Sequence, residues 1–222
     1  FVMAFPGIAE QMTPILWVLA ALTMIAGNVL AMAQTNIKRL LAYSSIASAG
    51  YLLVAFVPYG QAGLAAESVA SMLYYLAAYA FTTFGAWAVV ILLEGAEGKG
   101  LELSDYAGLA KKYPWLAAAM LIFMLSFAGI PLTVGFWGKF YLFRTAILGG
   151  QVVLAVIGLL TSLLAAFYYL RVVVAMYMKP GEPTAVREPW LHLVVGVMAA
   201  AVLLLSLIPG PLFDLASKAV IF

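Results

Sequence analysis

The stretch AGIPLTVGFWGKF, residues 128–140, lies in the middle of an apolar block that extends from residue 114 to residue 148. As one straight helix this block would be about 52 Å long at 1.5 Å per residue, well beyond the roughly 30 Å core of a bilayer. Pro131 removes an amide donor, and nearby glycines tolerate unwound backbone. These glycines are Gly129, Gly135 and Gly138. The sequence therefore predicts a helix broken near residues 129–135.

The composition around this block excludes a water-soluble fold. Hydrophobic residues make up 66% of the 222 residues and charged residues only 9%, whereas soluble domains are about 45–50% apolar and about 25% charged. The apolar blocks lack the strict alternation of outer-membrane strands. We therefore expect an all-α, polytopic membrane helix bundle, a single transmembrane domain over residues 1–222 with about six helices. The predicted helices cover residues 13–33, 40–58, 64–93, 114–148, 152–178 and 190–208.

The charges predict the orientation of the bundle. Lys and Arg residues gather in alternate connections, namely Lys38, Arg39, Lys99, Lys111, Lys112, Lys179 and Arg187. The connections at 59–63 and 149–151 contain none. By the positive-inside rule the basic connections are cytoplasmic. This pattern also favours one crossing for block 114–148 and places both ends of the chain on the outer face.

Lys139 is the main candidate for function. A charge at the centre of a membrane helix costs about 2.5–3.5 kcal/mol on insertion scales, and a broken helix must pack in protein or line a hydrated cavity. Lysine can exchange its proton, whereas arginine stays charged. A simple proline kink and a fixed ion pair are the alternatives, but block 114–148 contains no carboxylate. We therefore predict a proton relay at Lys139.

Other polar residues in the apolar blocks are weaker candidates. Arg171 could serve as a central charge, or could snorkel or bind carbonyls near the cytoplasmic end of its block. Glu67 could gate or form a pair, although an interfacial carboxylate is the more ordinary interpretation, and Arg144 is expected to anchor at the outer face. Hydroxyl groups could line a hydrated path or simply bond neighbouring helices. These hydroxyl candidates are Tyr43, Ser45, Tyr75 and Thr82.

The sequence gives no sign of a cofactor or metal bound by this chain. It has no cysteine, and its single histidine, His192, is expected at the membrane interface beside Trp190. Thiolate-held iron–sulfur clusters and His-based metal sites are therefore not expected. Walker and GxGxxG motifs are also missing, which argues against nucleotide binding. The net charge of +2 gives no indication of nucleic acid as a partner.

Three strings carry a resemblance to a known family: QTNIKRLLAYSSI at residues 34–46, DYAGL at 105–109 and AGIPLTVGFWGKF at 128–140. They resemble the antiporter-like membrane subunits of respiratory complex I, the NADH-quinone oxidoreductase. The first string and YYLR at 168–171 are most similar to the member called subunit N. The family has about fourteen helices in two inverted five-helix repeats. The resemblance implies the second repeat and the final helix here, with the first half of the family's length before Phe1.

The resemblance also implies a function. It implies a proton-translocating subunit in the bacterial cytoplasmic (inner) membrane, with Lys139 as the transferring lysine and Arg171 as a less secure central charge. Other membrane subunits of complex I would be its partners, and NADH, FMN, iron–sulfur clusters and quinone would belong to partner subunits. Two alternatives stay open: a subunit of a multisubunit sodium/proton antiporter and a passive membrane scaffold.

Overall fold

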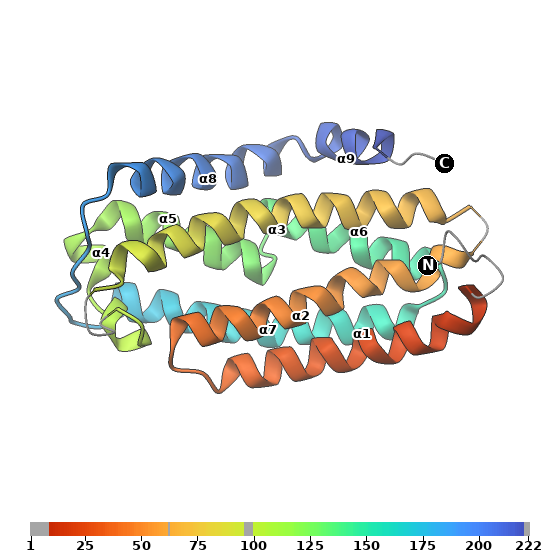
Figure 1. The fold of residues 1–222 in the computed structure, drawn as a ribbon, viewed down its shortest axis with the longest axis horizontal. Coiled ribbons are helices and arrows are strands. Elements are labelled where there is room, and N and C mark those ends of the chain that lie inside the picture. The colour runs from red at the N-terminus through yellow and green to blue at the C-terminus, as the bar shows by residue number, and fades with distance from the viewer. Residues whose placement is uncertain (1–8, 62, 96–99, 220–222) are drawn as a thin grey trace.

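A computed structural model describes residues 9–61, 63–95 and 100–219, which form a bundle of helices (Figure 1). The described residues contain no strand, and their one β-bridge joins Asn36 to Glu102. The predicted all-α membrane bundle is confirmed. The longer helices are α1 (Ala9–Met32), α2 (Ile37–Phe56), α3 (Ala65–Leu93), α5 (Pro114–Ala128), α6 (Val134–Leu148), α7 (Val152–Met178), α8 (Pro189–Leu207) and α9 (Pro209–Lys218). Short helical turns are η2 (Val57–Gly60), η4 (Leu103–Tyr106) and α4 (Leu109–Lys112).

The central helix of the bundle is α3, which contacts α2, α5, α6, α8 and α9. α1 packs against α2 and α7, and α8 lies along the opposite edge of the bundle (Figure 1). Among the described residues, α1, α2, α3, α7 and α8 are long and apolar enough to cross a membrane. α5 and α6 have 15 residues each and lie end to end (Figure 1). Each half is only about 22 Å long at 1.5 Å per residue, so one crossing requires both.

The basic connections meet at one end of the bundle, which we call the basic end. There the amide of Leu103 donates to the carbonyl of Thr35 at 2.8 Å, and the amide of Val186 donates to the carbonyl of Leu92 at 2.8 Å. Lys112 and Glu182 also form an ion pair there, with 3.2 Å between Nζ and Oε2. The links η2–α3 and α6–α7 lie at the other end (Figure 1).

Two parts of the orientation prediction fall outside the described residues. Lys99 lies outside the described residues, and so do the first eight and last three residues of the chain. The side of the membrane on which each end lies therefore stays a prediction.

Two features differ from the predicted helix ranges. The chain leaves helical geometry only over residues 129–133, so Gly135 and Gly138 lie inside α6 and not in unwound backbone. A further helix, α9, follows the last predicted block. Pro209 ends α8 and occupies the first position of α9, where its missing amide is tolerated. α9 was missed because it is short and carries its apolar residues on one face instead of in a continuous block.

Candidate functional site

The break between α5 and α6 has a defined backbone geometry. Gly129 caps α5 in the left-handed conformation, with φ 78° and ψ 38°, which glycine adopts at little cost. The amide of Ile130 then donates back to the carbonyl of Leu125 at 3.0 Å. Leu132 also has a positive φ of 73° and is 74% exposed. α6 begins after Thr133, whose hydroxyl donates to the carbonyl of Ile130 at 2.7 Å.

The break leaves two carbonyls at the end of α5 without their helical partners. In a continuous helix the carbonyl of Phe127 would accept from the amide of residue 131, but Pro131 has none. The carbonyl of Ala128 would accept from the amide of Leu132, but Leu132 is no longer part of the helix. Carbonyls at a helix C-terminus also carry the negative end of the helix dipole. The sequence thus creates a cation-binding position at this point.

Lys139 of α6 fills that position. Its Nζ donates to the carbonyls of Phe127 at 2.8 Å and Ala128 at 3.3 Å, and to the hydroxyl of Ser162 on α7 at 2.7 Å. The side chain is buried, with 6% exposed. Among the described residues no carboxylate forms an ion pair with it. The three acceptors match the three N–H groups of an ammonium ion, whereas a neutral amine has only two.

An aromatic ring completes the surroundings of the lysine. Nζ lies 4.9 Å from the ring centroid of Tyr51 on α2, within the range of a cation–π interaction. We call Lys139 together with Phe127, Ala128, Ser162 and Tyr51 the lysine site. It is formed by α2, α5, α6 and α7, which are separate in sequence and meet only in the folded bundle.

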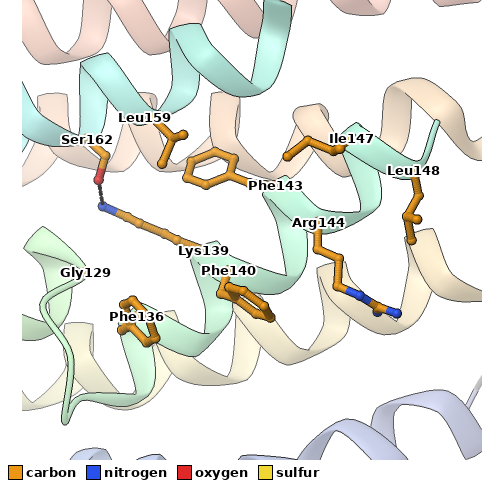
Figure 2. A pocket seen from close by; sticks show the side chains of 10 residues that line it. All are labelled: Gly129, Phe136, Lys139, Phe140, Phe143, Arg144, Ile147, Leu148, Leu159 and Ser162. Carbon is orange, nitrogen blue, oxygen red and sulfur yellow. Dashed lines mark hydrogen bonds between the residues drawn. The ribbon is translucent and has the colours of Figure 1, made fainter. Parts of the chain in front are cut away.

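A cavity of about 430 Å³ lies beside the lysine site (Figure 2). Figure 2 shows Lys139 reaching toward Ser162 on α7, while Arg144 points away from that helix. Apolar side chains form most of the cavity wall. They are Phe136, Phe140, Phe143, Ile147, Leu148 and Leu159. Lys139 and Ser162 also line the cavity, so the lysine side chain lies at its edge.

Close helix packing holds the break in place. A Cβ atom on Gly135 would lie 2.0 Å from the carbonyl oxygen of Ser126, and one on Gly138 would lie 3.0 Å from Cδ2 of Tyr75. The Gly135 amide instead donates to the Ser126 hydroxyl at 3.3 Å, and that hydroxyl bonds Thr82 at 2.8 Å. These glycines therefore serve close approach, and Gly129 alone of the three predicted glycines serves the turn.

The C-terminal helices brace the same segment from the other side. The Ser206 hydroxyl of α8 donates to the carbonyl of Leu132 at 2.9 Å, and the Trp137 indole donates to the carbonyl of Ser206 at 2.9 Å. Ser206 therefore joins α8 to the unwound segment and to α6. Phe213 of α9 stacks on Tyr141 of α6 with 4.2 Å between ring centroids. Both contacts hold the first half of α6 against the C-terminal helices.

The other charged candidates lie away from the lysine site. Glu67 forms an ion pair with Arg144 between α3 and α6. Arg171 donates from Nη1 to the carbonyl of Met32 at 3.2 Å, and from Nη2 to the carbonyl of Gln34. It therefore neutralises the C-terminal end of α1, consistent with the expected binding to carbonyls. Neither Glu67 nor Arg171 contacts Lys139.

The hydroxyl candidates separate into different contacts. Thr82 bonds Ser126 next to the break, and Tyr75 packs against Gly138 and stacks on Tyr79 with 6.0 Å between ring centroids. Ser45 accepts a hydrogen bond from the Tyr79 hydroxyl at 2.7 Å, whereas Tyr43 is partly buried against the core. The structure brings Thr82 and Tyr75 near the broken helix, and their part in a hydrated path stays a prediction.

Sequence reasoning missed several residues around the lysine. Asn28 and Ser126 lie in apolar helices as isolated polar residues, which is a signal that could have identified them. Tyr51, Ser162 and Tyr168 gave no comparable signal, because the apolar helices of this chain contain many tyrosines and serines. His192 lies near the start of α8, where Nδ1 is 3.0 Å from the carbonyl of Glu188. No group of three His, Asp or Glu residues in the described parts of the chain could hold a metal ion.

The fold and the site define a class of protein: an integral membrane protein with a discontinuous helix that presents an ionisable group in the bundle interior. Comparison with known families agrees. Residues 1–165 match the family described as "NADH:quinone oxidoreductase/Mrp antiporter, TM". The chain belongs to this family.

Two similar proteins are named as subunits of NADH-quinone oxidoreductase. The chain is 45% identical over 223 residues to NADH-quinone oxidoreductase subunit N 3 of Streptomyces griseus, covering 99% of this chain and 39% of that protein. It is 48% identical over 228 residues to subunit N of Salinispora arenicola, covering 100% and 43%. The chain thus spans about two fifths of the length of these relatives.

Solved structures share the fold. A chain of respiratory complex I from Thermus thermophilus with bound Aureothin has a TM-score of 0.79 and 35% identity, over 90% of this chain and 45% of that chain. A chain of the Mrp complex from Dietzia has a TM-score of 0.81, over 93% of this chain and 46% of that chain. Its identity of 20% shows a common fold only.

Proposed function

We propose that this chain forms part of a proton-translocating membrane subunit of NADH-quinone oxidoreductase, corresponding to subunit N. In this proposal it lies in the bacterial cytoplasmic membrane with the basic end in the cytoplasm, beside other membrane subunits of the complex. NADH, FMN, iron–sulfur clusters and quinone belong to those other subunits, and this chain binds none of them. Quinone reduction elsewhere in the complex would drive the transfer of a proton through the lysine site.

The observation that carries the proposal is the set of partners around Lys139. A permanently charged structural lysine is ordinarily neutralised by a carboxylate, but Lys139 bonds two carbonyls and one hydroxyl, all uncharged. Such a site can hold an ammonium ion without fixing its charge. A modest change in the surrounding field can then remove the proton, which a buried salt bridge would resist.

The geometry also links the charge of the lysine to its position. The ammonium form uses three donors for three acceptors. The amine form has two donors and a lone pair, so it keeps all three partners only if the Ser162 hydroxyl turns to donate to the lone pair and gives up its own bond to the carbonyl of Ala128. Loss of the proton therefore weakens the hold on the side chain, which can then move toward the adjacent cavity of about 430 Å³. Protonation draws it back to the end of α5.

Subunit N is favoured over a sodium/proton antiporter by the degree of similarity. The relatives that are 45% and 48% identical are named as subunits of NADH-quinone oxidoreductase, whereas the Mrp chain is 20% identical. The two functions differ in their driving reaction. Proton movement that depends on NADH oxidation supports the first, and proton movement driven by a sodium gradient alone would support the second.

The test uses the complete complex carrying substitutions at Lys139, reconstituted in proteoliposomes. Lys139→Met removes the exchangeable group, and Lys139→Arg keeps the charge but does not release a proton at neutral pH. We expect both variants to lower NADH-driven proton translocation by at least about tenfold, as for loss of an acid–base group. Lys111→Met, at an exposed lysine of the basic end, is the control. Normal translocation with Lys139→Arg would overturn the relay and favour a scaffold.

A further inference from the structure

A buried hydrogen-bonded network lies next to the lysine site. At its centre is Asn28 of α1, which is fully buried. Its Nδ2 donates to the carbonyl of Met24 at 2.7 Å and to the hydroxyl of Tyr51 at 3.2 Å. Its Oδ1 accepts from the hydroxyl of Tyr168 on α7 at 3.0 Å. An amide buried among apolar helices is costly unless its groups are bonded, and here both its nitrogen and its oxygen are.

The network fixes the position of the Tyr51 ring. The Tyr51 hydroxyl accepts from Asn28 and donates to Thr161 at 3.4 Å. The ring also meets the ring of Phe143 edge to face, with 6.1 Å between centroids and an interplanar angle of 80°. Held at its hydroxyl end and at its edge, the ring places its centroid 4.9 Å from Nζ of Lys139.

We infer that Asn28 and Tyr168 are positioning residues for Lys139, acting through the ring of Tyr51. This inference rests on the proposed proton exchange at Lys139. The face of an aromatic ring attracts an ammonium ion and has no comparable attraction for an amine. A ring held in place therefore favours the charged form of the lysine, and a ring free to turn away favours it less. Asn28 does not contact Lys139, so its effect requires Tyr51.

Two helices connect this network to the lysine directly. α7 supplies Ser162, which accepts from Lys139, and also Thr161 and Tyr168, which belong to the network. α2 supplies Tyr51 itself. A displacement of α7 relative to α1 would break the bond between Tyr168 and Asn28 and would move Ser162 as well. Both changes act on the same ammonium group.

The experiment is a double-mutant cycle on NADH-driven proton translocation by the complete complex. Tyr51→Leu removes the ring, and we expect it to lower the translocation rate by about tenfold, as for loss of a buried cation–π contact. Tyr51→Phe keeps the ring and loses the hydroxyl bonds, so its effect should be smaller, about threefold. Asn28→Leu should match Tyr51→Phe, because both release the ring without removing it.

The decisive comparison is Asn28→Leu in the Tyr51→Leu background. A residue that acts through Tyr51 has no further effect once the ring is gone, whereas a merely structural residue costs the same in both backgrounds. Equal costs in the two backgrounds would overturn the inference, as would equal rates for Tyr51→Phe and Tyr51→Leu. Rates are normalised to the amount of assembled complex in the membrane.

A second variant keeps the test valid if Asn28→Leu does not assemble. Tyr168→Phe removes only the hydroxyl that donates to Asn28, and we expect it to lower translocation about twofold to threefold in the normal background and not in Tyr51→Leu. Tyr74→Phe, at a buried tyrosine of α3 outside the network, is the matched control. The two hypotheses fail in different ways. Normal translocation with Lys139→Met would overturn the proposed function, whereas equal costs of Asn28→Leu in the two backgrounds would overturn this inference alone.

Discussion

Substitution of Gly135 tests the packing that holds the two halves of the broken helix together. A Cβ atom at this position would lie 2.0 Å from the carbonyl oxygen of Ser126 and 2.8 Å from its carbonyl carbon. Ordinary van der Waals contacts begin at 3.4 Å, so in Gly135→Ala the start of α6 must shift by roughly 1.4 Å away from α5. The obstacle is backbone, which cannot rotate aside as a side chain could.

The expected cost follows from this displacement. Overpacking a tightly packed interior costs about 1–3 kcal/mol, and the shift also lengthens the bonds from Lys139 to the carbonyls of Phe127 and Ala128. We expect Gly135→Ala to lower the thermal unfolding midpoint of the purified complex's membrane part and to reduce proton translocation. Gly196→Ala is the control, because the nearest atom to its new Cβ is 3.7 Å away. In a helix it should be neutral or stabilising by up to about 1 kcal/mol.

Gly135→Ala should therefore be destabilised relative to the original protein, whereas Gly196→Ala should not. If Gly135→Ala and Gly196→Ala give the same unfolding midpoint and the same translocation rate, α5 and α6 do not approach each other as closely as described. The argument that the glycines of α6 serve close packing would then be wrong.

The remaining predictions concern the charged residues outside the lysine site. Arg171→Gln removes the cation that binds the carbonyls of Met32 and Gln34, and we expect a loss of about 1–3 kcal/mol in stability, measured by thermal unfolding. A fall in proton translocation greater than the loss of assembled complex would contradict this structural role. Glu67→Gln breaks the partly exposed pair with Arg144 and should cost at most about 1 kcal/mol. A change in translocation at constant stability would instead indicate that the pair acts as a gate.

Much of the fold could be predicted from the sequence because the membrane limits the possibilities. Apolar length sets the spans, the alternating basic connections gather at one end of the bundle, and Pro131 with Gly129 marks the break. The extent of the unwound segment could not be predicted. Gly135 is an equally good residue for unwound backbone and for close helix packing, and only its distance from Ser126 distinguishes the two.

The site was predicted less completely than the fold. Lys139 stood out because a charge in the middle of an apolar block is costly. Its partners did not stand out, since two of the three are main-chain carbonyls and carry no side-chain signature. The role of Asn28 depends on the pairing of α1 with α2 and α7, which no local pattern in the sequence specifies.

The use of backbone carbonyls as partners has a consequence for how this site can vary during evolution. Replacing the side chain of Phe127 or Ala128 leaves the oxygen that accepts from Lys139 in place, so the two positions can drift among residues that fit the space. What cannot drift is the place where the helix stops. We therefore expect the position of the proline, four residues after the carbonyl that it releases, to be as restricted as that of a side-chain ligand of the lysine.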